Sequence, residues 1–246
     1  MYDLDFACIT NHGDRPINED AVGVKQKQDG QQYCFVLCDG LGGHGMGDVA
    51  SSVVKDTFLY AFEEAESMKH FLPNTFKKAQ EQLLLQQKEQ NATHKMKTTA
   101  VCVVCDDQKV SVGYVGDSRF YAFRKNCVAV QTADHSVPYR LYLSKMIRED
   151  EIRTHPDRNM LLRVMGVQWN DPQFEVLKTL KLKTIQAFLL CSDGFWELIT
   201  EADMCRLLQE SLSAQEWLSK MQAIIENSPK TDKDNYSAIA ILCHKR

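Results

Sequence analysis

Four short apolar runs follow one another between residues 98 and 132, and they constrain the fold more than any other feature. The runs are TTAVCVVC (98–105), KVSVGYVG (109–116), SRFYAFR (118–124) and CVAVQT (127–132). Short polar connections such as Asp106-Asp107 and Lys125-Asn126 separate them. A meander of short strands joined in this way is typical of an antiparallel sheet. The sequence therefore predicts a core of β structure.

Runs of the same kind flank this meander, and helical patterns lie between them. Strands are predicted at 4–10, 21–26, 33–39, 173–180, 185–192 and 236–243, with a turn at Asp29-Gly30. Apolar spacing predicts helices at 47–67, 71–90, 201–211 and 213–227, whereas 138–165 has no clean period and is expected to be irregular. With 246 residues and no linker or repeat, residues 1–246 are expected to form a single α+β domain, in which helices cover an antiparallel sheet assembly.

The charge balance argues against a nucleic-acid or membrane partner. Lys and Arg number 29 and Asp and Glu 33, so the net charge is −4 and the basic excess of such binders is missing. No run of about eighteen apolar residues occurs, and MYDLDFACITNHGD at the start has acids where an export signal has a basic segment. We therefore expect a cytoplasmic protein.

The nine cysteines are an odd number in a chain without an export signal, which favours reduced thiols over a disulfide framework. Cys102 and Cys105 have the spacing of half a zinc or redox site. Residues three apart on a strand point to opposite faces, however, so this pair cannot easily share a metal. Both are expected to be small core residues.

Acidic residues recur at the ends of predicted strands. Two similar runs, CFVLCDGLGG (34–43) and AFLLCSDGFW (187–196), end abruptly in Asp-Gly, where the glycine permits a tight turn. In all, five acidic positions lie at strand ends: Asp39, Asp193, the cluster Asn18-Glu19-Asp20, Asp117 and Asp234. An acid in such a place is costly unless it is paired or binds a cation.

Any single Asp-Gly pair is explained more simply as a turn. Five acidic positions without a histidine or cysteine spaced to accompany them instead describe an oxygen-ligand site for more than one Mg²⁺ or Mn²⁺ ion. Paired divalent ions of this kind activate water for hydrolysis of phosphate esters. Arg15, three residues before Asn18, is placed to hold the phosphoryl oxygens, although alone it would read as an ordinary surface arginine.

The sequence resembles the type 2C family of metal-dependent serine/threonine protein phosphatases, and its compact bacterial members in particular. The matching segments follow the family's order and cover nearly the whole chain: RPINEDA (15–21), VLCDGLGGHGMGDVAS (36–51), KTTAVCVV (97–104), VGYVGDSRFY (112–121), TADHS (132–136), HPDRNMLLRVMG (155–166), LLCSDGFWELIT (189–200) and DKDNYSAIAI (232–241). The resemblance implies a sandwich of two antiparallel β-sheets flanked by antiparallel helix pairs. It also implies hydrolysis of phosphoserine and phosphothreonine in proteins by a metal-activated water.

The same resemblance implies a role for each site residue. Asp39 would bridge two tightly bound Mn²⁺ or Mg²⁺ ions, and the Gly40 carbonyl would complete the ligands of one of them. Asp193 and Asp234 would bind the other ion. Asp117 would bind a weaker third ion together with Asp193.

The remaining matched residues would act around these ligands. Glu19 and Asp20 would touch the metal or hold its waters, and Asn18 and Asn235 would support the ligands. Arg15 would bind the substrate phosphate.

One departure concerns the general acid. Animal members carry a histidine directly after the first Asp-Gly, and this chain has Leu41 there. A metal-bound water is then the preferred proton source, with His44 as the alternative. His135 and His155 lie in loop motifs and are expected to be structural.

Two other functions stay open at this stage, a non-catalytic phosphoprotein-binding regulator and a hydrolase of small phosphoesters. Every ligand position is filled, which favours catalysis.

Residues 137–165 correspond to the family's flap beside the metal site, and their mixed charge suits either a docking surface or a solvated loop. The expected partners are phosphorylated proteins, including a serine/threonine kinase, and the expected state is a monomer.

Overall fold

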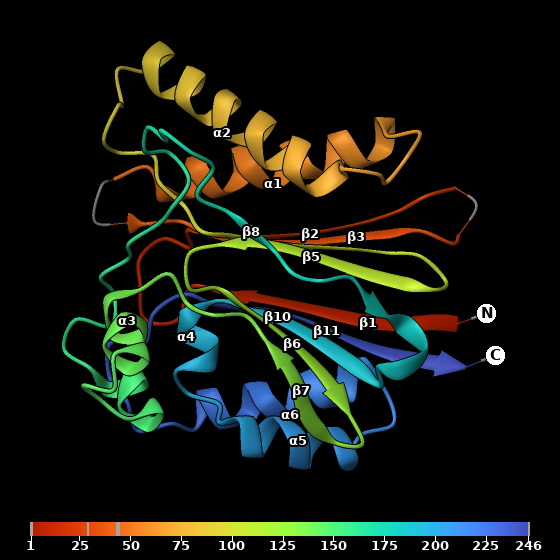
Figure 1. Ribbon diagram of the computed structural model, residues 1–246. Coiled ribbons are helices and arrows are strands. Elements are labelled where there is room, and N and C mark those ends of the chain that lie inside the picture. The colour runs from red at the N-terminus through yellow and green to blue at the C-terminus, as the bar shows by residue number, and fades with distance from the viewer. Residues whose placement is uncertain (1, 29, 43–44, 246) are drawn as a thin grey trace.

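Two antiparallel sheets pack face to face, and a pair of helices covers the outer face of each sheet (Figure 1). The computed structural model describes residues 2–28, 30–42 and 45–245. Within these residues no helix combines the length and the apolar content needed to cross a membrane.

The first sheet has the strand order β1 (Tyr2–Asn11), β11 (Tyr236–Lys245), β10 (Ala187–Cys191), β6 (Arg119–Arg124) and β7 (Cys127–Gln131). The second has the order β2 (Asp20–Gln26), β3 (Tyr33–Asp39), β4 (Ala100–Cys105), β5 (Lys109–Val115) and β8 (Glu175–Val176), with β9 (Leu180–Lys181) also paired to β5. The helices are α1 (Gly47–Glu64), α2 (Phe71–Glu89), α3 (Val137–Leu143), α4 (Asp193–Trp196), α5 (Glu201–Gln209) and α6 (Ala214–Glu226), with short 3-10 turns η2 (Glu149–Thr154) and η3 (Leu182–Thr184).

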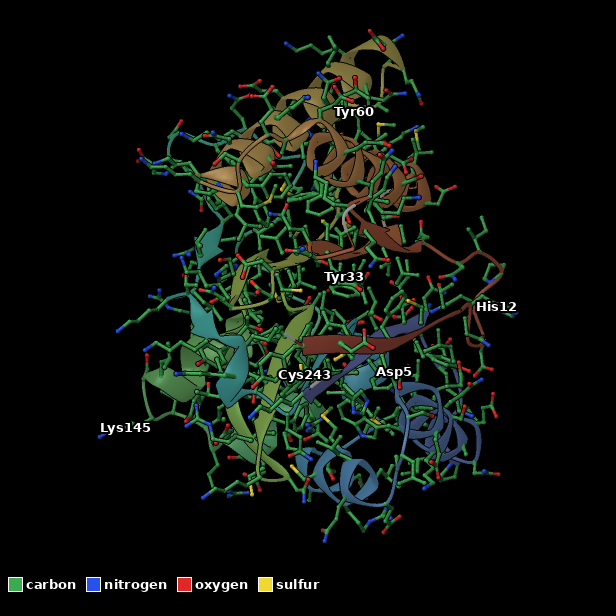
Figure 2. All side chains as sticks on the ribbon, turned by 90° about the vertical axis from the view of Figure 1, so that its right-hand side faces the viewer. Asp5, His12, Tyr33, Tyr60, Lys145 and Cys243 are labelled. Carbon is green, nitrogen blue, oxygen red and sulfur yellow. The ribbon has the colours of Figure 1, made fainter. Side chains whose placement is uncertain are left out.

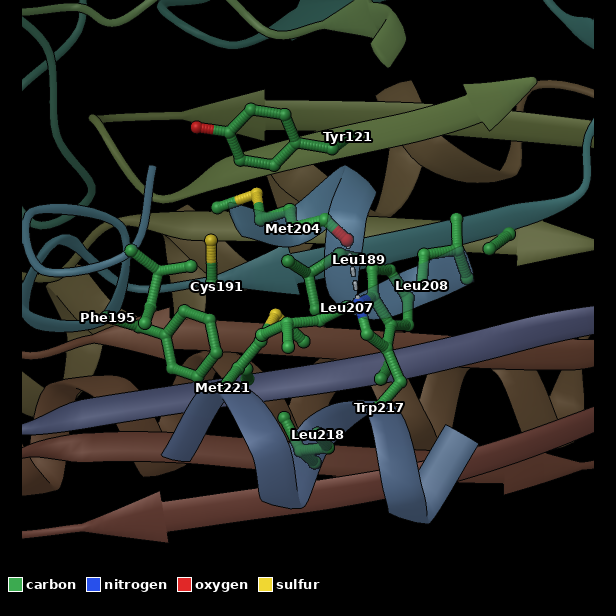
Figure 3. Packing of buried hydrophobic residues seen from close by; sticks show 14 of the residues in the cluster. Tyr121, Leu189, Cys191, Phe195, Met204, Leu207, Leu208, Trp217, Leu218 and Met221 are labelled. Carbon is green, nitrogen blue, oxygen red and sulfur yellow. Dashed lines mark hydrogen bonds between the residues drawn. The ribbon is translucent and has the colours of Figure 1, made fainter. Parts of the chain in front are cut away.

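The inner strands of each sheet are buried on both faces, which is why β3, β4 and β10 read as continuous apolar runs. Between the sheets, the rings of Phe35 and Phe188 meet edge to face with centroids 5.9 Å apart. A second core lies under α1 and α2, and a third, around Trp217, lies under α5 and α6 (Figure 3). These three cores pack the sheets and helices together, and the loops at the sheet ends extend from this packed frame.

Side-chain caps mark where the last helices begin. The hydroxyl of Thr200 accepts a hydrogen bond from the Asp203 backbone at the start of α5. At the start of α6, the Asp5 carboxylate on β1 (Figure 2) accepts one from the Ala214 backbone at 2.7 Å. These caps confirm both predicted helices and pin α6 to the edge strand of its sheet.

The structure corrects the predictions in two regions. Residues 138–165 contain the helix α3 and the turn η2, where an irregular segment was expected, because Ser136 caps a helix with proline in its first turn. The strand predicted at 173–180 is only the two short strands β8 and β9, since the chain pairs with β5 at two separate places. The predicted turn at Asp29-Gly30 includes Asp29, which lies outside the described residues.

The nine cysteines, all within the described residues, are free thiols. Cys102 faces the core under α1 and α2, whereas Cys105 faces the core between the sheets. This confirms that the pair points to opposite faces of its strand. Cys102 instead lies beside Cys34, with 3.7 Å between the two sulfurs.

Candidate metal centre

The predicted acidic positions converge at the end of the sandwich that lies opposite the chain termini, beside α3 and α4 (Figure 1). A cavity of about 650 Å³ opens there. Its charged lining comes from segments far apart in the sequence: Arg15, Glu19, Asp39, Asp48, Asp117, Asp193 and Asp234. Five of the six predicted acids therefore face one space, and Asp20 lies outside its lining.

The two Asp-Gly turns bring the backbone against neighbouring segments. A side chain at Gly40 would collide with the Gly47 carbonyl at the start of α1, and one at Gly194 with the Asn235 carbonyl at the start of β11. Neither glycine has a positive φ. Glycine is needed here for close approach of two backbones, which refines the expectation of a tight turn.

Two threonines at the start of the β4 segment hold the backbone of Asp39. Thr99 Oγ1 accepts from the Asp39 N–H at 3.0 Å, and Thr98 Oγ1 donates to the Asp39 carbonyl at 2.8 Å. Thr99 Oγ1 also bonds Ser118 Oγ at 2.7 Å, which ties this turn to the one that carries Asp117. The threonine pair directly before an apolar strand was the sequence signal for this role, and sequence reasoning missed it.

The carboxyl of Asp39 lies among other acids. Burial raises the pKa of Asp39 well above its ordinary range, and the charge of Asp193 adds to this effect. Asp20 is its direct cross-strand partner in the β2–β3 pair. Like charges placed directly opposite destabilise a sheet, so this pairing favours a bound cation.

Asp20 lies behind the cavity wall. Its Oδ2 accepts from Ser192 Oγ at 2.8 Å, whereas its Oδ1 is buried and has no hydrogen-bond partner among the described residues. Burial raises the pKa of Asp20 to about 7. Asn18 holds the strand start by accepting from the Asp20 N–H at 3.1 Å and donating to Thr10 at 2.8 Å. Ser192 is a further residue that sequence reasoning missed.

Asp193 is the first residue of α4. Burial is the main cause that raises its pKa to about 7, and the charge of Glu197 contributes. The charges of Asp234 and Asp20 raise the pKa of Asp193 further. Carboxyls that raise one another's pKa in this way form a site where a nearby cation favours the charged forms.

Asn235 and the start of α1 hold Glu19. The Glu19 N–H donates to Asn235 Oδ1 at 2.8 Å, and the Asn235 amide donates to the carbonyls of His12 and Ile17 at 2.9 and 3.0 Å. The Glu19 carboxylate accepts from the Gly47 N–H at 3.2 Å, and burial raises the pKa of Glu19. Asn235 thus positions the loop that carries Glu19.

Arg15 reaches into the cavity and binds Asp234. Its Nε and Nη2 donate to the two carboxylate oxygens, both at 3.2 Å. The charge of Asp234 raises the pKa of Arg15. The predicted phosphate-binding arginine is therefore paired with a predicted metal ligand.

Within residues 2–28, 30–42 and 45–245, no three histidine, cysteine, aspartate or glutamate side chains have the spacing of an assembled metal site. Asp234 is engaged by Arg15, and one oxygen of Asp20 by Ser192. The donor set nevertheless fits divalent ions, because it consists of several carboxylates that line one cavity and of one buried, unpartnered carboxylate oxygen behind its wall.

Leu41, which takes the place of the histidine of animal members, lines the cavity, and His44, the alternative proton source, lies outside the described residues. No histidine lines the described part of the cavity. His135 accepts from the Gly116 N–H at 3.1 Å, and His155 accepts from the Asp157 N–H at 3.1 Å, so both have local structural bonds.

Several residues of the cavity wall escaped the sequence reasoning, among them Asp48, Asn159 and Leu161. Asp48 lies in the first turn of α1, and Asn159 and Leu161 come from the segment after η2. None of them follows a strand, so the pattern of acids at strand ends could not identify them.

The metal-free protein is expected to lose stability from its buried acids as the pH rises. Asp20 has a pKa of about 7 in the folded state and an ordinary value of 3.8. Between these values the folded state binds more protons than the unfolded state, so the contribution of Asp20 to the free energy of unfolding falls with increasing pH. Asp20→Asn should therefore gain in Tm relative to wild type between about pH 4 and pH 7 without metal. A difference in Tm that is flat across this interval would show that Asp20 titrates normally.

Comparisons with known proteins agree with this geometry. The sequence profile of the family described as Protein phosphatase 2C matches residues 12–227. The serine/threonine phosphatase stp of Listeria welshimeri is 32% identical over 206 residues, which cover 81% of this chain and 80% of that protein. The crystal structure of serine/threonine phosphatase Stp1 from Staphylococcus aureus matches with a TM-score of 0.89 at 30% identity, over 98% of this chain and 95% of that one.

A fourth match concerns the fold alone. The catalytic domain of the serine/threonine protein phosphatase PstP in complex with two manganese ions has a TM-score of 0.82 at 20% identity, over 100% of both chains. Together with the sheet order, these likenesses confirm the predicted sandwich of two antiparallel sheets.

Proposed function

The chain belongs to the protein phosphatase 2C family and is a serine/threonine protein phosphatase, and we propose that its acidic cavity is where phosphoserine and phosphothreonine are hydrolysed. The observation that carries this proposal is the convergence of five predicted acids and Arg15 on one cavity. The enzyme is metal-dependent, as its family is, and we propose Mn²⁺ or Mg²⁺ as the ions.

The residues of the cavity divide into ligands and supports. Asp39 would lie between two tightly bound ions, with the Gly40 carbonyl on one of them and Asp193 and Asp234 on the other. Asp117 and Asp193 would hold a weaker third ion. When bound, the ions neutralise the carboxylates and activate water for attack on the phosphorus.

Two further acids complete this set. Glu19 lines the cavity and would hold an ion or its water from the side of α1. The buried, unpartnered oxygen of Asp20 supports the same role from behind the wall. Asn235 and Asn18 position these acids through their backbone bonds and would not contact an ion.

Arg15 would bind the phosphate group. Its planar guanidinium already makes a two-bond contact with a carboxylate, and the same fork fits two phosphoryl oxygens. Because Asp234 would turn to an ion, Arg15 would be released when metal binds.

The alternative functions make different demands on the site. A phosphoprotein-binding regulator needs no complete set of ligands, whereas every predicted ligand is present here. A hydrolase of small phosphoesters would cleave free phosphates as well as phosphopeptides.

We expect Mn²⁺-dependent phosphate release from a phosphothreonine peptide, its loss with EDTA, and slow release from free phosphothreonine. No release from the peptide at any Mn²⁺ concentration would contradict the proposal.

We propose that residues 137–165 dock the protein substrate. Asn159 and Leu161 of this segment line the cavity. Leu143, Met146 and Met160 are exposed on the same segment. Lys145, after α3, points away from the body of the protein (Figure 2). A surface of mixed apolar and charged side chains beside the cavity suits the residues that flank a phosphorylation site.

The cellular setting is also a proposal. Free thiols fit the reducing environment of the cytoplasm, where we place the protein. The lack of basic excess argues against nucleic acid and membranes as partners. We propose a monomer whose substrates are phosphoproteins, including a serine/threonine kinase.

Asp117→Asn should change the metal dependence without abolishing tight binding. Asp117 lies nearly fully buried in the cavity wall, and burial together with the charge of Asp193 raises the pKa of Asp117. Loss of one carboxylate should remove the weaker ion first, so activity should require more Mn²⁺. Calorimetry should still show the two tight ions. Simultaneous loss of every ion would mean that Asp117 belongs to the tight sites.

A further inference from the structure

Trp196 joins the two turns that carry Asp117 and Asp193. It is the last residue of α4, three residues after Asp193, and only 2% of it is exposed. Its indole N–H donates to the backbone carbonyl of Asp117 at 3.0 Å. A side chain from one acidic turn therefore holds the backbone of the acid in the other.

The indole ring is itself held by a buried ion pair. The guanidinium of Arg119 lies 3.5 Å from the centroid of the Trp196 ring. Arg119 donates to both carboxylate oxygens of Asp134, at 2.9 and 2.7 Å, and the two side chains are 4% and 1% exposed. Moving Arg119 would leave a buried charge unpaired, which is costly, so the ring has little freedom to shift.

Other bonds fix the rest of the Asp117 turn to different parts of the fold. The Gly116 N–H donates to His135, and Ser118 bonds Thr99 at 2.7 Å. These contacts anchor the turn to the loop before α3 and to the start of β4. The Trp196 bond relates the turn to α4 and so to Asp193.

We propose that Trp196 is a positioning residue that sets the separation of the Asp117 and Asp193 carboxylates, and thereby the affinity for the weaker ion. This inference rests on the proposed function, since it takes both carboxylates to share that ion. Both of them line the same cavity. Without the indole N–H the Asp117 carbonyl loses its partner in a buried place, and the turn is free to relax away from α4.

Trp196→Phe tests the proposal, and Trp217→Phe is its matched control. Trp217 is also fully buried and donates its indole N–H to a backbone carbonyl, that of Met204 at 3.0 Å (Figure 3). It lies in the core under α5 and α6 and does not line the cavity. Both substitutions remove an indole hydrogen bond to a backbone carbonyl and a similar side-chain volume. A difference in Mn²⁺ affinity between the two variants therefore reflects the place of Trp196 beside the acidic turns.

Calorimetric titration with Mn²⁺ is the main measurement. Loss of a partner that orients a metal ligand typically costs about 10- to 100-fold in affinity, so Trp196→Phe should weaken the weaker ion by roughly that factor and spare the tight ions. Trp217→Phe should lower the Tm and leave every ion at its wild-type affinity. Equal Mn²⁺ affinities in the two variants would overturn the proposal and leave Trp196 a packing residue.

A second measurement tests the proposal even if Trp196→Phe fails to fold. The chain has three tryptophans, so fluorotryptophan-labelled wild-type protein should give three fluorine resonances. The Trp169→Phe and Trp217→Phe variants assign two of them. The remaining resonance should shift with Mg²⁺ only as the weaker ion binds, and a constant position would overturn the proposal. Failure of the proposed function would instead be seen in wild type, which would bind no Mn²⁺ or release no phosphate.

Discussion

Asp193→Asn should reduce turnover of a phosphopeptide by more than about 100-fold at saturating Mn²⁺. Loss of a group that merely orients a ligand costs roughly 10- to 100-fold, and Asp193 would itself be a ligand of two ions. Its carboxyl lies in the cavity wall and its charge raises the pKa of Asp39, so the substitution removes a charge from the acid cluster. Steady-state kinetics over a Mn²⁺ series gives the turnover, and calorimetry gives the loss of ion affinity.

The fold should survive this substitution. Burial raises the pKa of Asp193 to about 7, so a neutral asparagine removes the cost of a buried charge in the metal-free protein. The metal-free Tm should therefore match wild type or exceed it, while the gain in Tm on adding Mn²⁺ should shrink.

Asp56→Asn is the matched control for Asp193→Asn. Asp56 lies on α1 with 65% of its side chain exposed, outside the cavity wall. Its replacement should leave turnover and Mn²⁺ affinity at wild-type values. Wild-type turnover of Asp193→Asn at saturating Mn²⁺ would remove Asp193 from the ligand set.

Arg15→Ala should raise the KM for a phosphopeptide by roughly 10- to 100-fold. A hydrogen bond to a charged group contributes about 1.5–3 kcal/mol, and about 1.4 kcal/mol corresponds to a factor of ten. Arg15→Lys should restore little, because an ammonium group cannot reproduce the two-bond contact of the guanidinium. Initial-rate measurements with peptide as the varied substrate separate this effect on KM from any fall in turnover.

The pair formed by Arg15 and Asp234 sets a second expectation for the same variant. Arg15 engages both oxygens of a proposed ligand, so it competes with the ion for Asp234. Its removal should leave Mn²⁺ affinity unchanged or increase it. Weaker Mn²⁺ binding with an unchanged KM would instead place Arg15 in a supporting role and exclude it as the phosphate-binding residue.

Local patterns predicted most of the elements and most of the acids. Apolar periodicity identifies α1, α2, α5 and α6, because the spacing of apolar residues along a helix is a local property of the sequence. The helix α3 was missed, because its seven residues are too few to show a clear helical period. The strand predicted at 173–180 is only β8 and β9, because where this segment pairs with β5 depends on the fold. Acids at strand ends correctly indicated five of the six acids that line the cavity, whereas Asp48 was missed and Asp20 lies outside the lining.

The sequence by itself determined which residues carry the charge of the site, since a carboxylate after a buried strand requires a counter-charge wherever that strand lies. Only the tertiary structure decided their partners. Arg15 and Asp234 are 219 residues apart, and Asp20 lies 172 residues from Ser192. The bond from Trp196 to Asp117 spans 79 residues. Such contacts depend on strand order and register, which are set by the packing of whole sheets, and no local run of residues encodes them.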